Sequence, residues 1–129
     1  MKHRSRHSQI AATVEELLRY DRPLHMFTRV AYEDIELRDQ TFKRGQEIGL
    51  MLGAAGRDPS LYTDPHTFNP YRAPKPHAAF GGGLHFCVGA PLARLELQVA
   101  LPALFAHFPD MKIAEPPQYA PTYHFHNLT

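Results

Sequence analysis

The 129-residue sequence is 43% hydrophobic, 21% charged and 11% aromatic. This is typical of one globular domain, because a chain of this length can bury roughly two-thirds of the surface that its unfolded form exposes. Its 14 Lys and Arg against 13 Asp and Glu give a net charge of +1, which disfavours nucleic acid as a partner. The single cysteine excludes a disulfide framework.

The sequence contains no segment that predicts a membrane span or a leader peptide. The longest weakly polar run, residues 48–56, falls far short of the roughly 20 residues that a span requires. The basic residues 1–8 lead into a short apolar stretch and two glutamates, without the apolar region of a signal peptide. We therefore expect a cytoplasmic protein in a reducing compartment.

Apolar spacing predicts the elements of the first half of the chain. Residues 8–20 have apolar positions at helical intervals with Pro23 just beyond, which predicts a helix. Residues 28–43 alternate around a polar turn at 38–40, which predicts a short β-hairpin. Residues 48–55 are compatible with a strand that leads into a short helix, and periodicity does not distinguish the two.

The second half combines a proline-rich stretch with the strongest predicted helix. Five of the twelve prolines fall between residues 59 and 76, which excludes regular structure there. An irregular connection of this length inside a domain is usually functional. The predicted helix over 90–108 tolerates Pro91 in its first turn, whereas Pro102 in its interior predicts a kink or a break.

Cys87 follows a glycine-rich loop and directly precedes this last helix. Unpaired backbone N–H groups at a helix start favour an anion, so we expect a thiolate. Glycines allow a bulky group to approach the backbone closely, and Phe80 and Phe86 provide flat apolar surface. A planar, largely apolar metal cofactor would fit. The alternative is a buried, unreactive cysteine in a glycine-rich turn.

The spacing of Phe80, Gly83, Cys87 and Gly89, F-x-x-G-x-x-x-C-x-G, resembles the haem-binding loop of the cytochrome P450 family. The resemblance implies haem b (iron protoporphyrin IX), with Cys87 as the proximal thiolate ligand of the iron. It also implies that Phe80, Gly81 and Gly89 border the cofactor.

Two further residues match family positions that bind haem propionates. They are Arg29, in the sequence Phe27-Thr28-Arg29-Val30, and His85, two residues before the cysteine. Carboxylates need cationic or N–H donors, so both residue types suit this role. The alternatives are a strand-surface charge for Arg29 and a backbone-bonded loop histidine for His85.

The sequence Glu16-Leu17-Leu18-Arg19 resembles the family's E-x-x-R motif, which places both charges on one helix face. Arg72, in Phe68-Asn69-Pro70-Tyr71-Arg72, resembles the arginine of the proline-rich meander that completes a structural triad. The alternatives are a weak surface ion pair and a solvated arginine.

The resemblance also suggests residues for binding partners. Leu24, His25, Met26 and Phe27, and with them residues 123–126, fall where family members contact a small hydrophobic substrate, although such clusters are equally typical of a core. A basic patch of Arg72, Lys75 and Arg94 would suit an acidic ferredoxin-type electron donor, the alternative being a solvated surface.

Two other features carry less weight. Nine histidines suggest zinc, with His124 near His126 and His85 near Cys87, but structural zinc sites need four clustered ligands, so zinc is disfavoured. Gly56 occupies a place where bacterial family members often carry asparagine.

The resemblance implies that residues 8–129 form a partial P450 domain, with residues 1–7 unplaced. The expected fold is the C-terminal part of the P450 fold: mainly α with small β-hairpins, an irregular meander, the cysteine loop and a long last helix. The implied activity is haem-dependent monooxygenation of a small organic substrate with O₂. We expect this short chain to be inactive alone, of marginal stability and prone to aggregate. The alternatives are a truncated non-enzymatic remnant and a haem-binding or sensing module.

Overall fold

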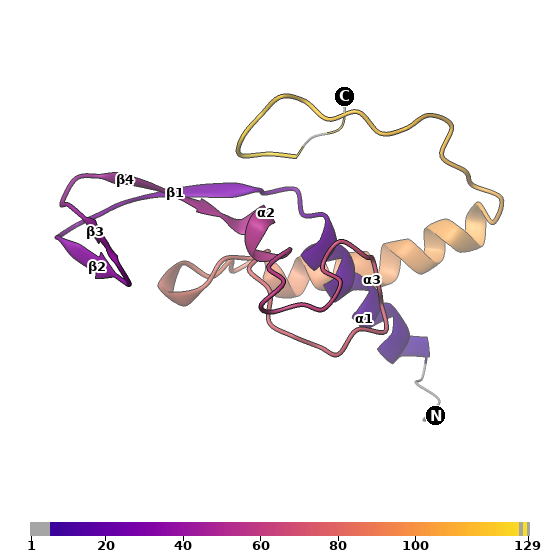
Figure 1. Cartoon of the computed structure of the whole chain (residues 1–129). Helices are drawn as coiled ribbons and strands as arrows, with labels where there is room; N and C mark the ends of the chain where they lie inside the picture. The colour runs from indigo at the N-terminus through magenta and orange to yellow at the C-terminus, as the bar shows by residue number, and fades with distance from the viewer. Residues whose placement is uncertain (1–5, 127, 129) are drawn as a thin grey trace.

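The computed structural model describes residues 6–126 and residue 128, and its elements follow the predicted order (Figure 1). No helix in these residues is long and apolar enough to cross a membrane. The elements are α1 (Arg6–Tyr20), β1 (Met26–Val30), β2 (Ile35–Leu37), β3 (Gln40–Phe42), β4 (Glu47–Met51), α2 (Leu52–Ala55), the 3₁₀ turn η1 (Gly83–His85) and α3 (Ala90–His107).

The strands form two antiparallel pairs, so the predicted hairpin is confirmed over residues 35–42 with its turn at Arg38, but residues 28–30 do not belong to it. β2 pairs with β3 around a tight turn in which Arg38 has a φ of 55°. β1 pairs instead with β4, from Met26 opposite Met51 to Val30 opposite Glu47. The sharp turn at Arg38 closes a hairpin with only three residues in each strand. β1 lies outside this hairpin and pairs with β4, the strand that follows it.

The buried core is small and lies where α1 meets α3 and the segment before the cysteine loop. Val14 and Leu18 from α1 pack with Ala79, and three half-buried side chains complete this cluster: Phe80, Leu97 and Leu101. Large apolar side chains along the rest of α3 are exposed, among them Leu92, Leu95, Val99, Leu104 and Phe105. A helix with an apolar face exposed to water has an unused packing surface.

α3 continues to His107 with Pro102 in its interior, so the break expected at this proline does not occur. Proline removes one N–H donor, which leaves the carbonyl four residues earlier without its helical partner. Pro102 is exposed, so water has access to this part of the helix and can satisfy the carbonyl. Pro91 lies in the first turn, as predicted.

Candidate functional site

The cysteine loop is closed by short-range backbone hydrogen bonds and presents Cys87 to solvent. The N–H of Cys87 donates to the carbonyl of Phe80 at 3.0 Å, and the N–H of Ala90 donates to the carbonyl of Cys87 at 3.2 Å. Cys87 is exposed, so the alternative of a buried cysteine is wrong for this structure. The thiol therefore lies at the exposed end of a loop whose backbone is fixed on both sides.

Glycine sets the path of this loop, and exposed apolar residues lie near Cys87 in the sequence. Gly81 and Gly83 have φ angles of 74° and 64°, a region that side-chain-bearing residues rarely adopt. Leu84 and Val88 on either side of Cys87 are fully exposed. Such apolar side chains gain stability when a flat apolar group covers them.

The start of α3 is electrostatically suited to an anion beside Cys87. Gly89 occupies the N-cap position and has no side chain that could cap the helix. Pro91 lies in the first turn, after Ala90. The N–H of Ala90 is already bonded to the carbonyl of Cys87 and Pro91 has no N–H, so the positive end of the helix dipole is the feature that favours negative charge nearby.

Phe80, before the three glycines, and Phe86, before Cys87, lie close to each other. Their ring centroids lie 6.4 Å apart in an edge-to-face arrangement. Phe80 is half-buried and Phe86 is exposed, so one ring anchors the loop to the core while the other remains available to a ligand.

The structure brings together Glu16, Arg19 and Arg72, the three residues of the expected triad. Glu16 and Arg19 form a bidentate ion pair at 2.7 and 2.8 Å, and Nε of Arg72 lies 3.4 Å from the same carboxylate. Glu16 is 5% exposed and Arg19 2%, so the weak surface pair is excluded. Burial disfavours ionised Glu16, but hydrogen bonds from Arg19 and from the N–H of Asn69 outweigh it and lower the Glu16 pKa.

Both arginines also donate to carbonyl groups of the proline-rich meander. Arg19 donates to Pro65 at 2.9 Å and to Thr67 at 3.3 Å, and also to Gly56, just before the meander, at 2.6 Å. Arg72 donates to the carbonyls of Thr63, Asp64 and Thr67. A segment that has no regular structure thus obtains partners for its carbonyls from two guanidinium groups, which fix it against α1.

A second ion-pair cluster, which sequence reasoning missed, joins α1 to α3. Arg94 binds Glu15 through two contacts of 2.6 and 3.0 Å, and His77 lies 3.0 Å from the same carboxylate. The Arg94 guanidinium also lies 4.7 Å from the centre of the Phe80 ring. Burial opposes ionisation of Glu15, but Arg94 and His77 outweigh it and lower the Glu15 pKa, whereas burial lowers the pKa of His77. The acidic doublet at 15 and 16 was the available signal.

The expected basic patch is altered by these contacts. Arg72 and Arg94 are each paired with a glutamate, and Lys75 donates to the carbonyl of Leu61. Internal pairing of Arg72 and Arg94 reduces the positive charge that this patch can offer to a partner, whereas Lys75 remains exposed.

Arg29 and His85, the expected propionate ligands, both lie at exposed positions. Arg29 is on β1, where it donates to the carbonyl of Thr28 at 2.8 Å and lies 5.7 Å from the Phe27 ring centre. His85 ends η1, two residues before Cys87. Both side chains are accessible to an anionic ligand.

The two expected substrate segments lie beside each other. Leu24 forms an isolated antiparallel bridge with Phe125, and the N–H of His25 donates to the carbonyl of His124 at 2.9 Å. The side chains from Leu24 to Phe27 are half-buried. The C-terminal tail thus borders the segment between α1 and β1.

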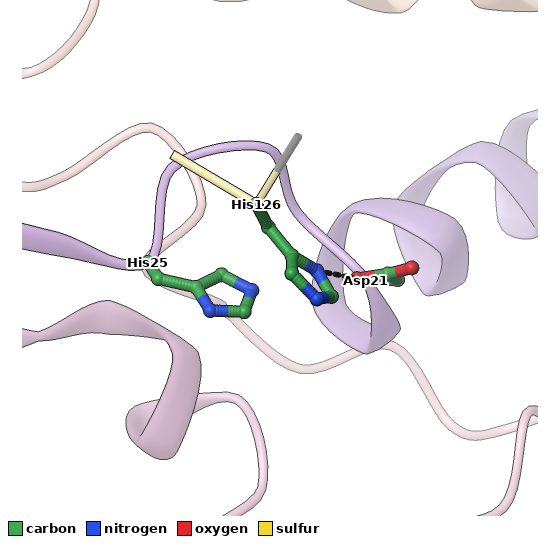
Figure 2. Close-up of side chains that lie close together, drawn as sticks. All are labelled: Asp21, His25 and His126. Carbon is green, nitrogen blue, oxygen red and sulfur yellow. Dashed lines mark hydrogen bonds and ion pairs between the residues drawn. The ribbon is translucent and has the colours of Figure 1, made fainter. Parts of the chain in front are cut away.

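The side chain of His126 meets those of Asp21 and His25 at this junction (Figure 2). The neighbouring His124 is not part of this group. Its Nδ1 atom lies 2.8 Å from Oδ1 of Asp21, and its ring faces that of His25 at 4.1 Å. Burial, together with the nearby His126, lowers the pKa of His25.

Bacterial cytochromes P450 are similar in sequence to this chain. The chain is 44% identical over 115 residues to a biotin biosynthesis cytochrome P450 of Bacillus subtilis, which covers 89% of this chain and 29% of that protein. It is 47% identical over 109 residues to the polyketide biosynthesis cytochrome P450 PksS of the same organism, which covers 84% of this chain and 27% of that protein.

Solved structures of cytochromes P450 also match the fold of this chain. A crystal structure of P450BioI in complex with an acyl carrier protein ligated to hexadec-9Z-enoic acid matches with a TM-score of 0.89 at 43% identity, over 95% of this chain and 32% of that one. Ligand-free CYP164A2 of Mycobacterium smegmatis matches with a TM-score of 0.89 at 41% identity, over 96% of this chain and 32% of that one.

The chain therefore spans about a third or less of the relatives that it matches. The family model for cytochrome P450 matches residues 1–122, and the neighbouring structures share the fold that the cysteine loop suggested. This chain belongs to the cytochrome P450 family.

Proposed function

We propose that this chain is the haem-ligating part of a haem-thiolate monooxygenase, with Cys87 as the proximal ligand of haem b. The observation that carries the proposal is the exposed Cys87 at an uncapped helix start, between fully exposed Leu84 and Val88. A thiol donor within an apolar surface suits a flat, apolar metal cofactor. A reducing, cytoplasmic compartment would keep the thiol free of disulfides.

The other residues fit the cofactor through their chemistry. Arg29 and His85 are exposed donors of the kind that haem propionates require. Phe80 and Phe86 offer ring surface, and Gly81 and Gly89 keep side chains away from it. Haem, when bound by a thiolate, supplies the O₂ chemistry of the family.

The buried ion pairs would serve the site by holding its frame. Glu16, Arg19 and Arg72 fix the meander to α1, and Arg94 fixes α3 to α1 while it covers Phe80. We propose a structural role for the first set, because its charged groups are used among themselves and on backbone carbonyls.

We further propose that Leu24, His25, Met26 and Phe27 border the binding place of a small hydrophobic substrate. Their half-buried side chains next to the C-terminal tail support this role. Electrons would come from a ferredoxin-type donor, although the internal pairing of Arg72 and Arg94 leaves Lys75 as the cation of the expected patch without a carboxylate partner in the described structure.

Haem binding without turnover is the second candidate function. The observation that favours it is the exposure of Cys87, Leu84 and Val88, which would leave a cofactor bound there open to water. Desolvation is part of what makes such a site productive.

One experiment tests both. The purified chain is mixed with haem, reduced and exposed to carbon monoxide, and the difference spectrum is recorded for the wild type and for Cys87→Ser. We expect a thiolate-type Soret shift that the variant lacks. An identical spectrum in both proteins, or no retained haem, contradicts ligation by Cys87. Substrate turnover by the chain alone would exclude the second candidate.

A further inference from the structure

Asp21, His25 and His126 bring three metal-ligating side chains together from segments far apart in the sequence. Each offers one ligand atom, and these atoms all lie within 4.8 Å of one another (Figure 2). They come from the end of α1, the residue before β1 and the C-terminal tail. No other such group of three occurs among the residues that the structure describes.

We propose that Asp21, His25 and His126 form a binding site for Zn²⁺ or a similar divalent transition metal, which clamps the C-terminal tail to the end of α1. The site is separate from Cys87, and the inference does not depend on haem binding. Two imidazoles and one carboxylate, with water in the remaining position, are a ligand set that zinc accepts.

The backbone holds the two histidine-bearing segments in place. The N–H of His25 donates to the carbonyl of His124 at 2.9 Å, and the N–H of His126 donates to the carbonyl of Pro23 at 2.8 Å. These bonds flank the Leu24–Phe125 bridge. The two histidines are therefore neighbours because of main-chain pairing, and their approach does not depend on a flexible side chain.

Tyr119 contacts two of the three proposed ligands, His126 and Asp21, and orients them. Its ring stacks on that of His126, with centroids 3.6 Å apart and planes at 11°, and its hydroxyl donates to Oδ2 of Asp21 at 3.1 Å. Oδ1 is thereby left toward His126, at 2.8 Å from its Nδ1. Partners that orient a metal ligand in this way are typical of metal sites.

Small adjustments suffice for coordination. Ligand atoms around tetrahedral zinc lie about 3.3 Å apart, since each bond is about 2.0–2.1 Å. Asp21 and His126 would separate by about half an ångström as the cation replaces the proton between them, which passes to water. The His25 ring lies at 35° to that of His126, so it must rotate to direct a nitrogen at the same centre. The exposed Asp21 admits water to the remaining position.

The test is calorimetric titration of the full chain with Zn²⁺ alone. His126→Phe keeps a flat ring to stack on Tyr119 but removes the ligand nitrogen. Asp21→Asn replaces the carboxylate by a neutral amide, which is a weaker metal ligand. We expect each to reduce the affinity at least about tenfold. His124→Ala is the matched control, because its side chain lies outside the group while its backbone bond remains. Weak binding by the wild type, or an equal loss in His124→Ala, would overturn the proposal.

A second measurement keeps the test independent of stability changes in the variants. Tyr123 is exposed, so chymotrypsin can cleave the tail near the site. Zn²⁺ is expected to slow this cleavage in the wild type and in His124→Ala, but not in His126→Phe or Asp21→Asn. If Zn²⁺ protects all four proteins equally, or none, the clamp does not exist. Zn²⁺ affinity and protection from chymotrypsin should both be the same in Cys87→Ser as in the wild type, even if this variant no longer binds haem.

Discussion

The buried guanidinium of Arg22 fills the space next to Gly56. A Cβ at position 56 would lie 1.6 Å from Nη2 of Arg22 and 2.6 Å from the carbonyl oxygen of Arg19. Arg22 is 2% exposed and donates at 2.5 Å to the carbonyls of both Arg19 and Leu52. A side chain at position 56 therefore has no room here, because Arg22, two residues beyond α1, occupies the space.

We expect Gly56→Ala to lower the free energy of unfolding by about 2 kcal/mol or more, because overpacking a filled site forces neighbouring groups to move. Urea denaturation of the chain gives the value. Arg22→Gln relieves part of the contact, so the double variant is expected to lose less stability than the two single losses combined. Strict additivity would show that the two residues do not share this space.

Replacement of Glu16 by Gln is expected to cost about 3–5 kcal/mol, because it leaves the buried Arg19 without its countercharge. The pKa of Glu16 is lowered in the folded state, so the unfolded chain binds the proton more readily. Its contribution is present above the unfolded pKa and is lost as the pH falls through the folded one. Unfolding at a series of pH values from about 6 to 3 should show a shallower dependence in Glu16→Gln than in the wild type.

His77 is expected to make the fold sensitive to mild acid. Burial lowers its pKa, so the unfolded chain takes up the proton first as the pH falls. The stabilisation by neutral His77 is complete above its unfolded pKa of about 6.5 and declines below it. The free energy of unfolding should fall less between pH 7 and pH 5 in His77→Gln than in the wild type. An unchanged slope would mean that His77 is not the responsible group.

Gly83 and Gly82 provide a matched pair in the cysteine loop. A Cβ would meet nothing within 4 Å at either position, but Gly83 has a φ of 64° whereas Gly82 is extended. Gly83→Ala should therefore cost about 1 kcal/mol, and Gly82→Ala should stay within about 0.5 kcal/mol of the wild type. Thermal unfolding measures both. Equal effects would argue against backbone conformation as the cause.

The exposed apolar face of α3 is expected to make the chain self-associate. Leu95→Glu removes one of its large side chains and should reduce the apparent mass in sedimentation velocity. Ala100→Glu adds the same charge at another exposed position without removing a large apolar group, and should have a smaller effect. A monomeric wild type with a sharp cooperative unfolding transition would contradict this expectation.

Local signals in the sequence determined the helices and the cysteine loop. The apolar spacing of α1 and α3, the proline density of the meander and the glycines before Cys87 each act within one segment, where spacing or a single residue type restricts the backbone. Glu16 and Arg19 share a face for the same reason. Of the kink or break predicted at Pro102, the break does not occur, because α3 continues through this residue to His107.

The tertiary structure alone decided which distant segments meet. β1 selects β4, Glu15 meets Arg94 across 79 positions, and Asp21 meets His126 across 105. A charge or a strand edge in the sequence indicates a need for a partner but not which partner, because that depends on how whole elements pack. The cysteine loop was readable from its own residues, whereas the Asp21, His25 and His126 group became visible only once the tail lay beside the end of α1.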